Sequence, residues 1–429
     1  MLYERWLKIA RENGNAQALH DLASGRRWTF CQLEKAAEQG GLGDEAVVFP
    51  CGNSPQFILN VLRAWRLDRV VCPLEFGQPQ PELCGELPPG VIHLKSTSAS
   101  TGASRLVAFR GEQLAADAEN IVNTMGLRVD WPNLGVISLA HSYGFSNLVL
   151  PLLLKGIPLV LVEGSLPEAV RLAAGDLDDV TLPAVPALWR AWHEAGVIPE
   201  HTRLAISAGA PLPLPLEQEV FAMQGLKIHN FYGSSECGGI AYDETDLPRT
   251  DAACVGSALQ DVQISIGEDG CVEVRGESVG ETYWPEAVDR LSGGVFRTSD
   301  LGEIIAGRIY LRGRAGNQIN VAGRKVLPEV IERALLEHEG VKECLVFGVP
   351  SSDAERGESI VGCLVLEEML TLESLRDFLI HKLPAWQVPR EWWLVDSLAA
   401  NHRGKISRAD WRARYLSMRA ERLDSSASS

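Results

Sequence analysis

The 429-residue chain lacks several features that would each point to a particular class of protein. Its nine cysteines stand singly, with no CxxC pair and an odd total, which favours reduced thiols over a disulfide framework or a zinc site. No apolar run reaches the length of a membrane span, and the opening MLYERWLKIARENG carries charges where a signal peptide has an apolar core. Lys and Arg total 40 against 56 Asp and Glu, and the net charge of −16 argues against a broad nucleic-acid or anionic-membrane surface. We therefore expect a cytoplasmic protein with no membrane span and no nucleic-acid partner.

The hydrophobic pattern of the first half is typical of a layered α/β domain. Short apolar runs, such as EAVVFP at 45–50 and LGVISLA at 134–140, alternate with helix-like segments, such as SPQFILNVLRAW at 54–65 and GEQLAADAENIVNTM at 111–125. From about Gly256 the pattern changes to short alternating strands with glycine-rich turns, which predicts a small β-subdomain.

A second, smaller unit follows GRAGN at 313–317. Here PEVIERALLEHEG at 328–340 and TLESLRDFLIHKLP at 371–384 predict helices, whereas VKECLVFGVP at 341–350 and REWWLVDSL at 390–398 predict strands. The predicted fold class is α/β, with a large N-terminal domain of layered sheets and helices over 1–315 and a smaller α+β domain over 316–418. We expect residues 419–429, which end in LDSSASS, to form a disordered tail.

The stretch STSASTGASR at 96–105 places hydroxyl residues and a glycine just after the apolar run VIHL at 91–94. Such a loop between a strand and a helix can present N–H and O–H donors to phosphate oxygens, and Arg105 adds a permanent positive charge. The stretch matches neither the P-loop pattern nor GxGxxG, so on its own it fits an ordinary loop as well as a phosphate site.

Five further motifs, with this loop, resemble the adenylate-forming superfamily of acyl-CoA synthetases, luciferases and peptide-synthetase adenylation domains. The family's loop reads approximately TSGSTGxPK, and this chain has TSASTGASR at 97–105. Then come, in the family's order, SAGAPLP (207–213), FYGSSE (231–236), RTSDLGEI (297–304), GRAGNQINVAGRKVLPEVIE (313–332) and NHRGKISR (401–408). The resemblance implies a mobile C-terminal lid domain and a two-step reaction. A carboxylate attacks the α-phosphate of ATP to give an acyl-adenylate and pyrophosphate, and a nucleophile, commonly a thiol, then displaces AMP.

The resemblance also implies roles for individual residues, carried by donors, cations and one metal ligand. Lys405 matches a mobile lysine that reaches the α-phosphate and the attacking carboxylate, Ser235 matches a hydroxyl facing those groups, and Glu236 matches the Mg²⁺ ligand. Tyr232 matches the aromatic that stacks on adenine. Asp300 would accept the ribose hydroxyls, and Arg314 would lie near ribose and phosphate. The remaining implied nucleotide contacts are Thr97, Ser98, Ser100, Thr101, Gly102, Arg105, Gly209, Ala210 and Pro211.

The acceptor side of the site is implied by the same resemblance. Gly323, Arg324 and Lys325 lie where thiolation-competent members meet coenzyme A or the phosphopantetheine of an acyl carrier protein, although the two cations equally fit the basic edge of a hairpin. The hinge of the family is normally Asp or Lys, and here it is Gly316, whose backbone freedom should ease rotation.

The acyl substrate is described only by class. The segment LAHSYGFSN at 139–147 resembles the HxxG segment of acyl- and aryl-acid activating members and lacks the Asp that pairs a substrate ammonium, so a free amino acid is disfavoured. His141, Phe145, Ala208 and Gly233 are the implied pocket residues, and His141 equally fits a structural, hydrogen-bonded role.

Two other functions stay open at this point. An adenylating enzyme could deliver the acyl group to an amine, a hydroxyl or an internal lactone. A non-catalytic nucleotide-binding relative is favoured by Ala99, Ser104 and Arg105, which replace the glycine, proline and lysine of the family's loop. It is disfavoured by the presence of the chemistry-bearing side chains Glu236, Asp300, Arg314 and Lys405.

Overall fold

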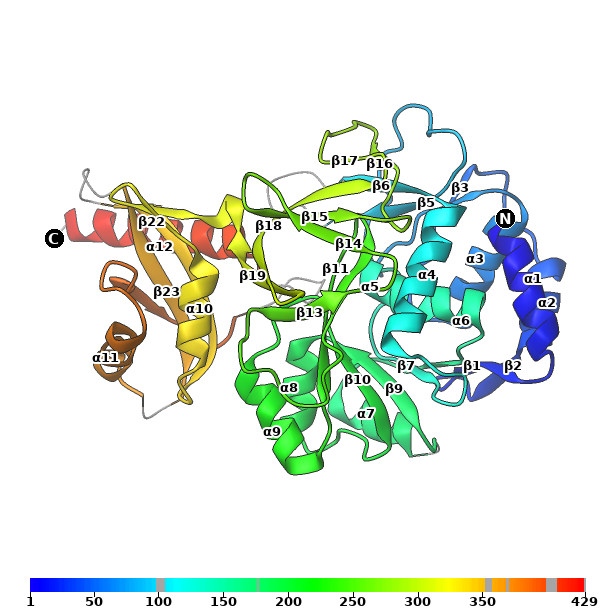
Figure 1. Ribbon diagram of the computed structural model, residues 1–429, viewed down its shortest axis with the longest axis horizontal. Coiled ribbons are helices and arrows are strands. Elements are labelled where there is room, and N and C mark those ends of the chain that lie inside the picture. The colour runs from blue at the N-terminus through cyan, green and yellow to red at the C-terminus, as the bar shows by residue number, and fades with distance from the viewer. Residues whose placement is uncertain (98–104, 176, 352–356, 368–369, 399–406, 428–429) are drawn as a thin grey trace.

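The computed structural model describes residues 1–97, 105–175, 177–351, 357–367, 370–398 and 407–427. Most of the larger, N-terminal part is built on one twisted sheet (Figure 1). Its parallel half consists of β1 (Gln17–Asp21), β8 (Leu159–Leu161), β7 (Asn133–Gly135), β9 (Val180–Ala184), β10 (Thr202–Ser207) and β11 (Ile228–Ser234), with β2 (Arg26–Thr29) at its edge. It continues as an antiparallel half of β12 (Gly238–Tyr242), β13 (Cys254–Ala258), β19 (Arg308–Arg314), β18 (Val295–Ile305), β15 (Cys271–Arg275) and β14 (Gln263–Ile266), with β17 (Leu291–Ser292) on β18. The strands predicted as a β-subdomain therefore extend the main sheet.

A second sheet covers the other side of this part. Its strands are β16 (Thr282–Trp284), β6 (Leu106–Arg110), β5 (Val91–Ser96), β4 (Val70–Val71) and β3 (Val47–Val48). The helices of this part are α1 (Leu2–Asn13), α2 (Phe30–Gln39), α3 (Pro55–Arg66), α4 (Gly111–Met125), α5 (Ser142–Gly144), α6 (Leu150–Lys155), α7 (Pro167–Ala174), α8 (Pro186–Glu194), α9 (Leu214–Gln224) and the π-helical η1 (Phe145–Val149). One large cluster of buried side chains runs from Leu2 to Ile309 between these layers.

The smaller, C-terminal part has its own core. It contains the hairpin β20 (Ile319–Val321) and β21 (Arg324–Val326), the sheet β22 (Val341–Pro350), β23 (Glu358–Leu366) and β24 (Glu391–Leu394), and the helices α10 (Pro328–Leu336), α11 (Leu372–Lys382) and α12 (Arg408–Ala427). Two buried clusters lie wholly within it. The mixed α/β fold with a large N-terminal and a smaller C-terminal domain is confirmed, and the boundary at 315/316 stays a prediction.

The two parts touch where the chain crosses between them. The Arg333 guanidinium on α10 donates to the carbonyl oxygens of Leu311 at 2.8 Å and Arg312 at 3.1 Å, both on β19. The linking 3₁₀ turn is η2 (Ala315–Asn317).

The predicted disordered tail at 419–429 is wrong over its first residues, because α12 continues to Ala427. Trp411 and Tyr415 lie one turn apart on this helix and are buried against the C-terminal sheet. Further along, Arg419 donates to the carbonyl oxygen of Pro350 at 3.1 Å and lies 3.6 Å from Glu391. These contacts hold a segment whose polar composition suggested disorder.

The predicted strand at 134–140 is also shorter than expected. β7 ends at Gly135, and Val136 N–H then donates to the carbonyl oxygen of Leu134 at 3.0 Å. Two later backbone donors bind side chains: Leu139 N–H donates to Asn53 Oδ1 at 2.9 Å, and Ala140 N–H to Ser138 Oγ at 3.2 Å. The chain thereby leaves the sheet before the segment predicted to bind the acyl group.

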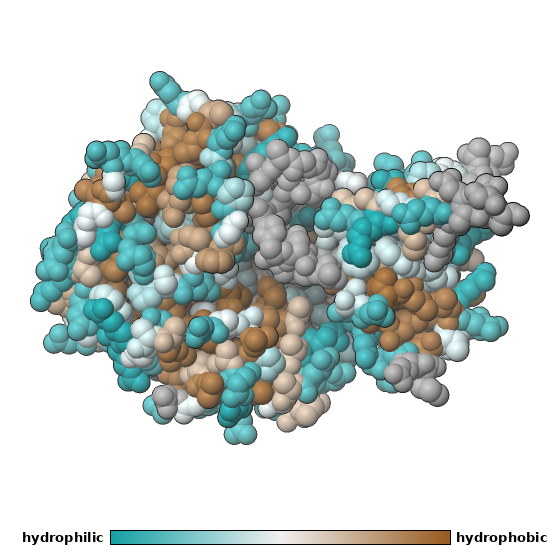
Figure 2. Space-filling view, turned by 180° about the vertical axis from the view of Figure 1, so that it is seen from behind, coloured by the Kyte–Doolittle hydropathy of each residue, from teal (hydrophilic) through white to brown (hydrophobic). Residues whose placement is uncertain are grey.

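The surface mixes hydrophilic residues with patches of hydrophobic ones on both parts (Figure 2). This is usual, since apolar atoms contribute over half of a typical folded surface. None of the described helices is both long enough and apolar enough to cross a membrane.

Candidate active site

Asp300 joins three segments that the sequence analysis assigned to the nucleotide. It lies on β18 directly opposite Arg314 of β19, because the antiparallel register pairs these two residues. Arg314 Nε donates to Asp300 Oδ1 at 2.9 Å, and Tyr232 Oη donates to Asp300 Oδ2 at 2.6 Å. The structure therefore brings together Tyr232, Asp300 and Arg314, although 68 residues separate the first two.

The charge states in this cluster follow from burial. Burial, and then the neighbouring Asp300, raise the pKa of Tyr232 well above its ordinary value, so its hydroxyl stays protonated and acts as a donor. The Asp300 side chain is 15% exposed, and each carboxylate oxygen has a lone pair beyond the bond it already accepts. This arrangement can accept two hydroxyl groups from one ligand.

Glu236 lies between the two sheets of the N-terminal part. Tyr283 of β16 donates its hydroxyl to Glu236 Oε1 at 2.9 Å, and the Arg105 guanidinium lies 6.0 Å from the Tyr283 ring centroid. Burial, then Glu236, raise the pKa of Tyr283, so it too remains a donor. The end of the predicted phosphate loop and the predicted metal ligand are thus brought together through Tyr283.

Tyr283 was missed by the sequence analysis. It stands 47 residues from Glu236 on a strand of the other sheet, so no local pattern connects the two. An aromatic donor within a three-residue strand carries no motif of its own.

The two serines of the turn after β11 differ in their hydrogen bonds. Ser234 Oγ accepts from Glu236 N–H at 3.2 Å and lies 3.3 Å from Cys237 Sγ, which fixes the turn. Within the described part of the chain, Ser235 makes no side-chain hydrogen bond, which leaves its hydroxyl available to a ligand. A Cβ at Gly233 would lie 2.7 Å from the Gly238 carbonyl oxygen, so only glycine fits there.

The described ends of the phosphate loop are tied to each other. Thr97 donates from both its N–H, at 2.8 Å, and its hydroxyl, at 3.1 Å, to the carbonyl oxygen of Arg105. Ser98, Ser100, Thr101 and Gly102 lie outside the described residues, as does Lys405.

The SAGAP segment follows β10 at the edge where β11 also ends. Parallel pairing aligns Ser207 with Asn230, so the loop after β10 lies beside the strand that carries Tyr232. Ala208 is buried, whereas Gly209, Ala210 and Pro211 are exposed. Gly209 has a φ of +85°, a left-handed conformation that favours glycine.

Two of the residues predicted for the acyl pocket have partners within the protein. His141 caps α5, with its Nδ1 accepting from Tyr143 N–H at 3.2 Å, which supports the structural role left open for it. Phe145 is 1% exposed and packs between the rings of His93, 4.4 Å away, and Phe57, 6.5 Å away. Its contact with the acyl group stays a prediction.

Of the predicted thiol-acceptor residues, Gly323 lies in the turn of the hairpin β20–β21, and Arg324 and Lys325 begin its second strand. Ala322 and Gly323 have φ values of +53° and +79°, the pair of positive values that a tight two-residue hairpin turn requires. Arg324 stacks over Trp386, 5.2 Å from its ring centroid, and Lys325 is exposed. Gly316 has open space around a would-be Cβ and a φ outside the left-handed region.

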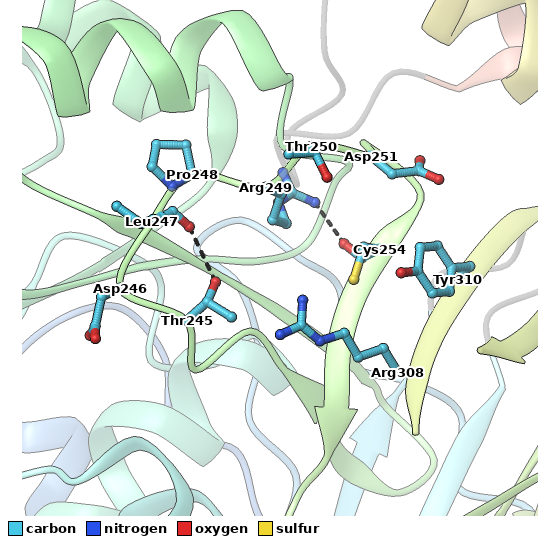
Figure 3. A pocket seen from close by; sticks show the side chains of 10 residues that line it. All are labelled: Thr245, Asp246, Leu247, Pro248, Arg249, Thr250, Asp251, Cys254, Arg308 and Tyr310. Carbon is cyan, nitrogen blue, oxygen red and sulfur yellow. Dashed lines mark hydrogen bonds between the residues drawn. The ribbon is translucent and has the colours of Figure 1, made fainter. Parts of the chain in front are cut away.

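A cavity of about 500 Å³ opens near the far end of β19 (Figure 3). It is lined by Thr245, Asp246, Leu247, Pro248, Arg249, Thr250, Asp251, Cys254, Arg308 and Tyr310. None of the residues predicted for the nucleotide, metal, acyl or thiol roles lines it.

The donor set fits magnesium better than a transition metal. The described residues include no group of three or more His, Cys, Asp or Glu side chains that could hold a metal ion. Glu236 therefore offers a single hard carboxylate, and Mg²⁺ is commonly held by one or two carboxylates together with phosphate oxygens and water.

Comparison with known proteins shows which family the chain belongs to. The family model for AMP-binding enzymes matches residues 94–284, and the model for the C-terminal domain of AMP-binding enzymes matches residues 330–405. The chain belongs to this adenylate-forming family of enzymes. Three of the six motifs lie wholly within the matched residues, those at 313–332 and 401–408 lie partly within them, and the one at 297–304 falls between the two matches.

Individual relatives are distant in sequence. A feruloyl-CoA synthase of Amycolatopsis is 28% identical over 77% of this chain and 72% of its own length. A Bacillus anthracis enzyme that ligates 3,4-dihydroxybenzoate to an aryl-carrier protein is 26% identical over 73% of this chain and 72% of its own length. The crystal structure of ATP-bound MatB from Rhodopseudomonas palustris superposes with a TM-score of 0.84 at 20% identity, covering 96% of this chain and 98% of that one. This superposition shows the fold.

Proposed function

We propose that the protein is an AMP-forming acid–thiol ligase. It adenylates an acyl or aryl carboxylic acid with ATP, releases pyrophosphate, and transfers the acyl group to a thiol with release of AMP. The observation that carries the proposal is the Asp300 carboxylate held by Tyr232 and Arg314, within a chain of the AMP-binding enzyme family. Relatives that ligate acids to coenzyme A or to a carrier protein support the thiol as acceptor.

In this proposal Asp300 holds the ribose of ATP. Tyr232 donates to one carboxylate oxygen of Asp300 and Arg314 donates to the other, which orients the carboxylate. Each oxygen keeps a lone pair that can accept a ribose hydroxyl. The Tyr232 ring is half-buried against the N-terminal core, and its exposed part would stack on adenine. Ala210 and Pro211, exposed on the neighbouring loop, complete the adenine side.

Glu236 would hold Mg²⁺, and Tyr283 orients the Glu236 carboxylate by its hydrogen bond. When bound, Mg²⁺ supplies positive charge to the phosphate oxygens as pyrophosphate leaves. Arg105 lies on the same side, next to Tyr283, where it can neutralise the β- and γ-phosphates. Ser235 donates to the α-phosphate or the substrate carboxylate, and Lys405 offsets the charge as these two anions approach.

The second half-reaction uses the C-terminal domain. Rotation about Gly316 would withdraw Lys405 and bring the hairpin β20–β21, with Gly323 in its turn and Lys325 on β21, to the entry path of the thiol. Arg324 would be held by Trp386. Both coenzyme A and a phosphopantetheinyl carrier protein suit a site with these basic groups.

The cytoplasmic location of the protein stays a prediction. It fits the nine free cysteines and is tested by cell fractionation.

The test is acid-dependent ATP–pyrophosphate exchange across a panel of fatty, aromatic and hydroxy acids. We expect exchange with a subset of these acids, and thioester formation when coenzyme A or a phosphopantetheinyl carrier protein is added. Lys405→Ala should lose exchange yet still transfer a supplied acyl-adenylate to the thiol. No exchange with any acid would count against adenylation, whereas AMP release that responds to amines and not to thiols would favour a non-thiol acceptor.

A further inference from the structure

A buried ion pair lies beneath the proposed active site. Lys95 Nζ is 3.7 Å from Asp117 Oδ2, and the two side chains are 3% and 2% exposed. Ser146 completes the cluster: its hydroxyl donates to Asp117 Oδ2 at 2.6 Å and accepts from Lys95 Nζ at 3.2 Å. Lys95 also lies 4.6 Å from the centre of the Phe109 ring. Removing two charges from water is costly, and well-packed apolar residues often serve stability as well, so stability alone does not explain this pair.

The second carboxylate oxygen of Asp117 binds the backbone just after the Ser235–Glu236 turn. Asp117 Oδ1 accepts from Gly239 N–H at 3.0 Å, three residues after Glu236. A Cβ at Gly238 would lie 2.0 Å from the same oxygen, and Gly238 has a φ of +70°. The glycine is therefore required twice, by its backbone conformation and by the approach of the carboxylate. Asp117 holds the backbone at the exact point where the turn joins β12.

The other two members of the cluster belong to the remaining parts of the site. Lys95 is in β5, two residues before Thr97 and the phosphate loop. Ser146 follows Phe145 in η1, a π-helical turn of the kind that is frequent at functional sites. Three chain segments, assigned above to the phosphates, the acyl group and the metal, thus meet in one buried cluster.

We propose that Lys95, Asp117 and Ser146 form a positioning network that fixes the Ser235–Glu236 turn relative to the phosphate loop and the acyl segment. The inference rests on the proposed function, which assigns those segments. The three residues touch no reacting atom, and they act through the backbone of Gly238 and Gly239. Because adenylation needs Ser235 and Glu236 and thiol transfer depends on them less, the network should govern the first half-reaction.

The test compares the same substitution at two buried carboxylates. Asp117→Ala removes the acceptor of Gly239 N–H, and we expect the maximal rate of adenylation to fall about 10- to 100-fold, as for a displacement of the order of 1 Å, with KM for ATP changed less than threefold. Transfer of a supplied acyl-adenylate to the thiol should stay within threefold of wild type. Asp243→Ala is the matched control: Asp243 is also a buried carboxylate paired with a lysine, at the opposite end of β12, and its adenylation rate should stay within threefold of wild type.

A rescue variant separates positioning from folding. In Lys95→Met/Asp117→Asn the charge pair is removed together, and the amide keeps an oxygen for Gly239 N–H and a donor for Ser146, so adenylation should return to within about threefold of wild type. The inference is overturned if Asp117→Ala adenylates at the wild-type rate, if both half-reactions fall equally, or if the double variant is no faster than Asp117→Ala. A wild-type protein that exchanges pyrophosphate with no acid would instead overturn the proposed function.

Discussion

Two buried ion networks lie at opposite ends of one strand pair, β11 and β12. At one end Asp117, which pairs with Lys95, accepts from Gly239 N–H beside the Ser235–Glu236 turn. At the other end Lys227 precedes β11 and Asp243 follows β12, and their side chains are 2.7 Å apart. The charged side chains of both networks are buried, so each network must satisfy its charges internally.

The remote network does this with matched ions and contacts that hold a loop. Glu217 of α9 pairs with Lys227 and, at 2.8 Å, with Arg249, whose remaining N–H groups donate to the carbonyl oxygens of Leu212 and Cys254 at 2.8 Å. It joins α9 to the loop after β12 and, through Arg249, to the carbonyl oxygen of Leu212 at the end of the SAGAPLP segment. The side chains of its Lys227–Asp243 pair bind Glu217 and Thr245, which are assigned to no substrate. Two charge pairs that are equally buried can therefore have different roles. The residues that a pair contacts, and not the extent of its burial, indicate its role.

The largest effect on stability is expected from Glu217→Ala. The substitution leaves Lys227 and Arg249 without their shared carboxylate, and breaking such a buried pair costs about 3–5 kcal/mol of unfolding free energy. Urea unfolding measures the loss, and adenylation by the folded variant should keep its wild-type rate. Glu219→Ala on the same helix, where the side chain is 60% exposed, should change stability by less than about 0.5 kcal/mol. A specific loss of adenylation in the Glu217 variant would break the comparison.

At the active-site end, Asp300→Asn should act on ATP affinity. An amide offers one oxygen instead of two, and hydrogen bonds to a charged group are worth about 1.5–3 kcal/mol, so the dissociation constant of ATP should rise about 10- to 100-fold. Calorimetric titration with ATP checks this. Folding should change little, because the Arg314 partner is half exposed. Unchanged affinity for ATP would remove Asp300 from the nucleotide site.

Tyr283→Phe should have a smaller effect at the same end. It deletes the hydroxyl that orients Glu236, at a cost of about 1 kcal/mol, which corresponds to about a fivefold rise in the Mg²⁺ concentration for half-maximal exchange. Tyr310→Phe, in the cavity near the far end of β19, is the matched control and should leave the Mg²⁺ requirement as it is. Equal responses of the two variants would argue that Tyr283 does not serve the metal.

The smallest effect is expected in the C-terminal hairpin. Ala322 has a φ of +53°, which costs alanine about 1–2 kcal/mol, and glycine's greater freedom in the unfolded chain offsets part of the relief. Ala322→Gly should therefore stabilise the protein by about 0.5 kcal/mol in thermal unfolding. Gly323→Ala, at φ +79°, should destabilise it by about 1 kcal/mol. A stabilising Gly323→Ala would show that the turn adapts to either residue.

Local patterns predicted much of this molecule. The helix at 111–125 agrees with α4 residue for residue, because its apolar spacing is complete and Gly126 ends it in a left-handed conformation. The motifs FYGSSE, RTSD and GR likewise led to Tyr232, Asp300 and Arg314, which the sheet brings into contact.

Long-range contacts were not predictable in the same way. Nothing in the sequence signals that Lys95 on β5 pairs with Asp117 on α4, and Tyr283 reaches Glu236 from another sheet. The length of α12 was missed because contacts with β22 and β24, and not its own composition, hold it.

The most direct test is acid-dependent ATP–pyrophosphate exchange, measured side by side for wild type, Asp117→Ala and Asp243→Ala at a temperature where all three are folded. We expect exchange in wild type, a 10- to 100-fold slower rate in Asp117→Ala, and a rate within threefold of wild type in Asp243→Ala. Equal rates in the two variants would contradict the separate roles of the two networks, and no exchange in wild type would contradict the ligase itself.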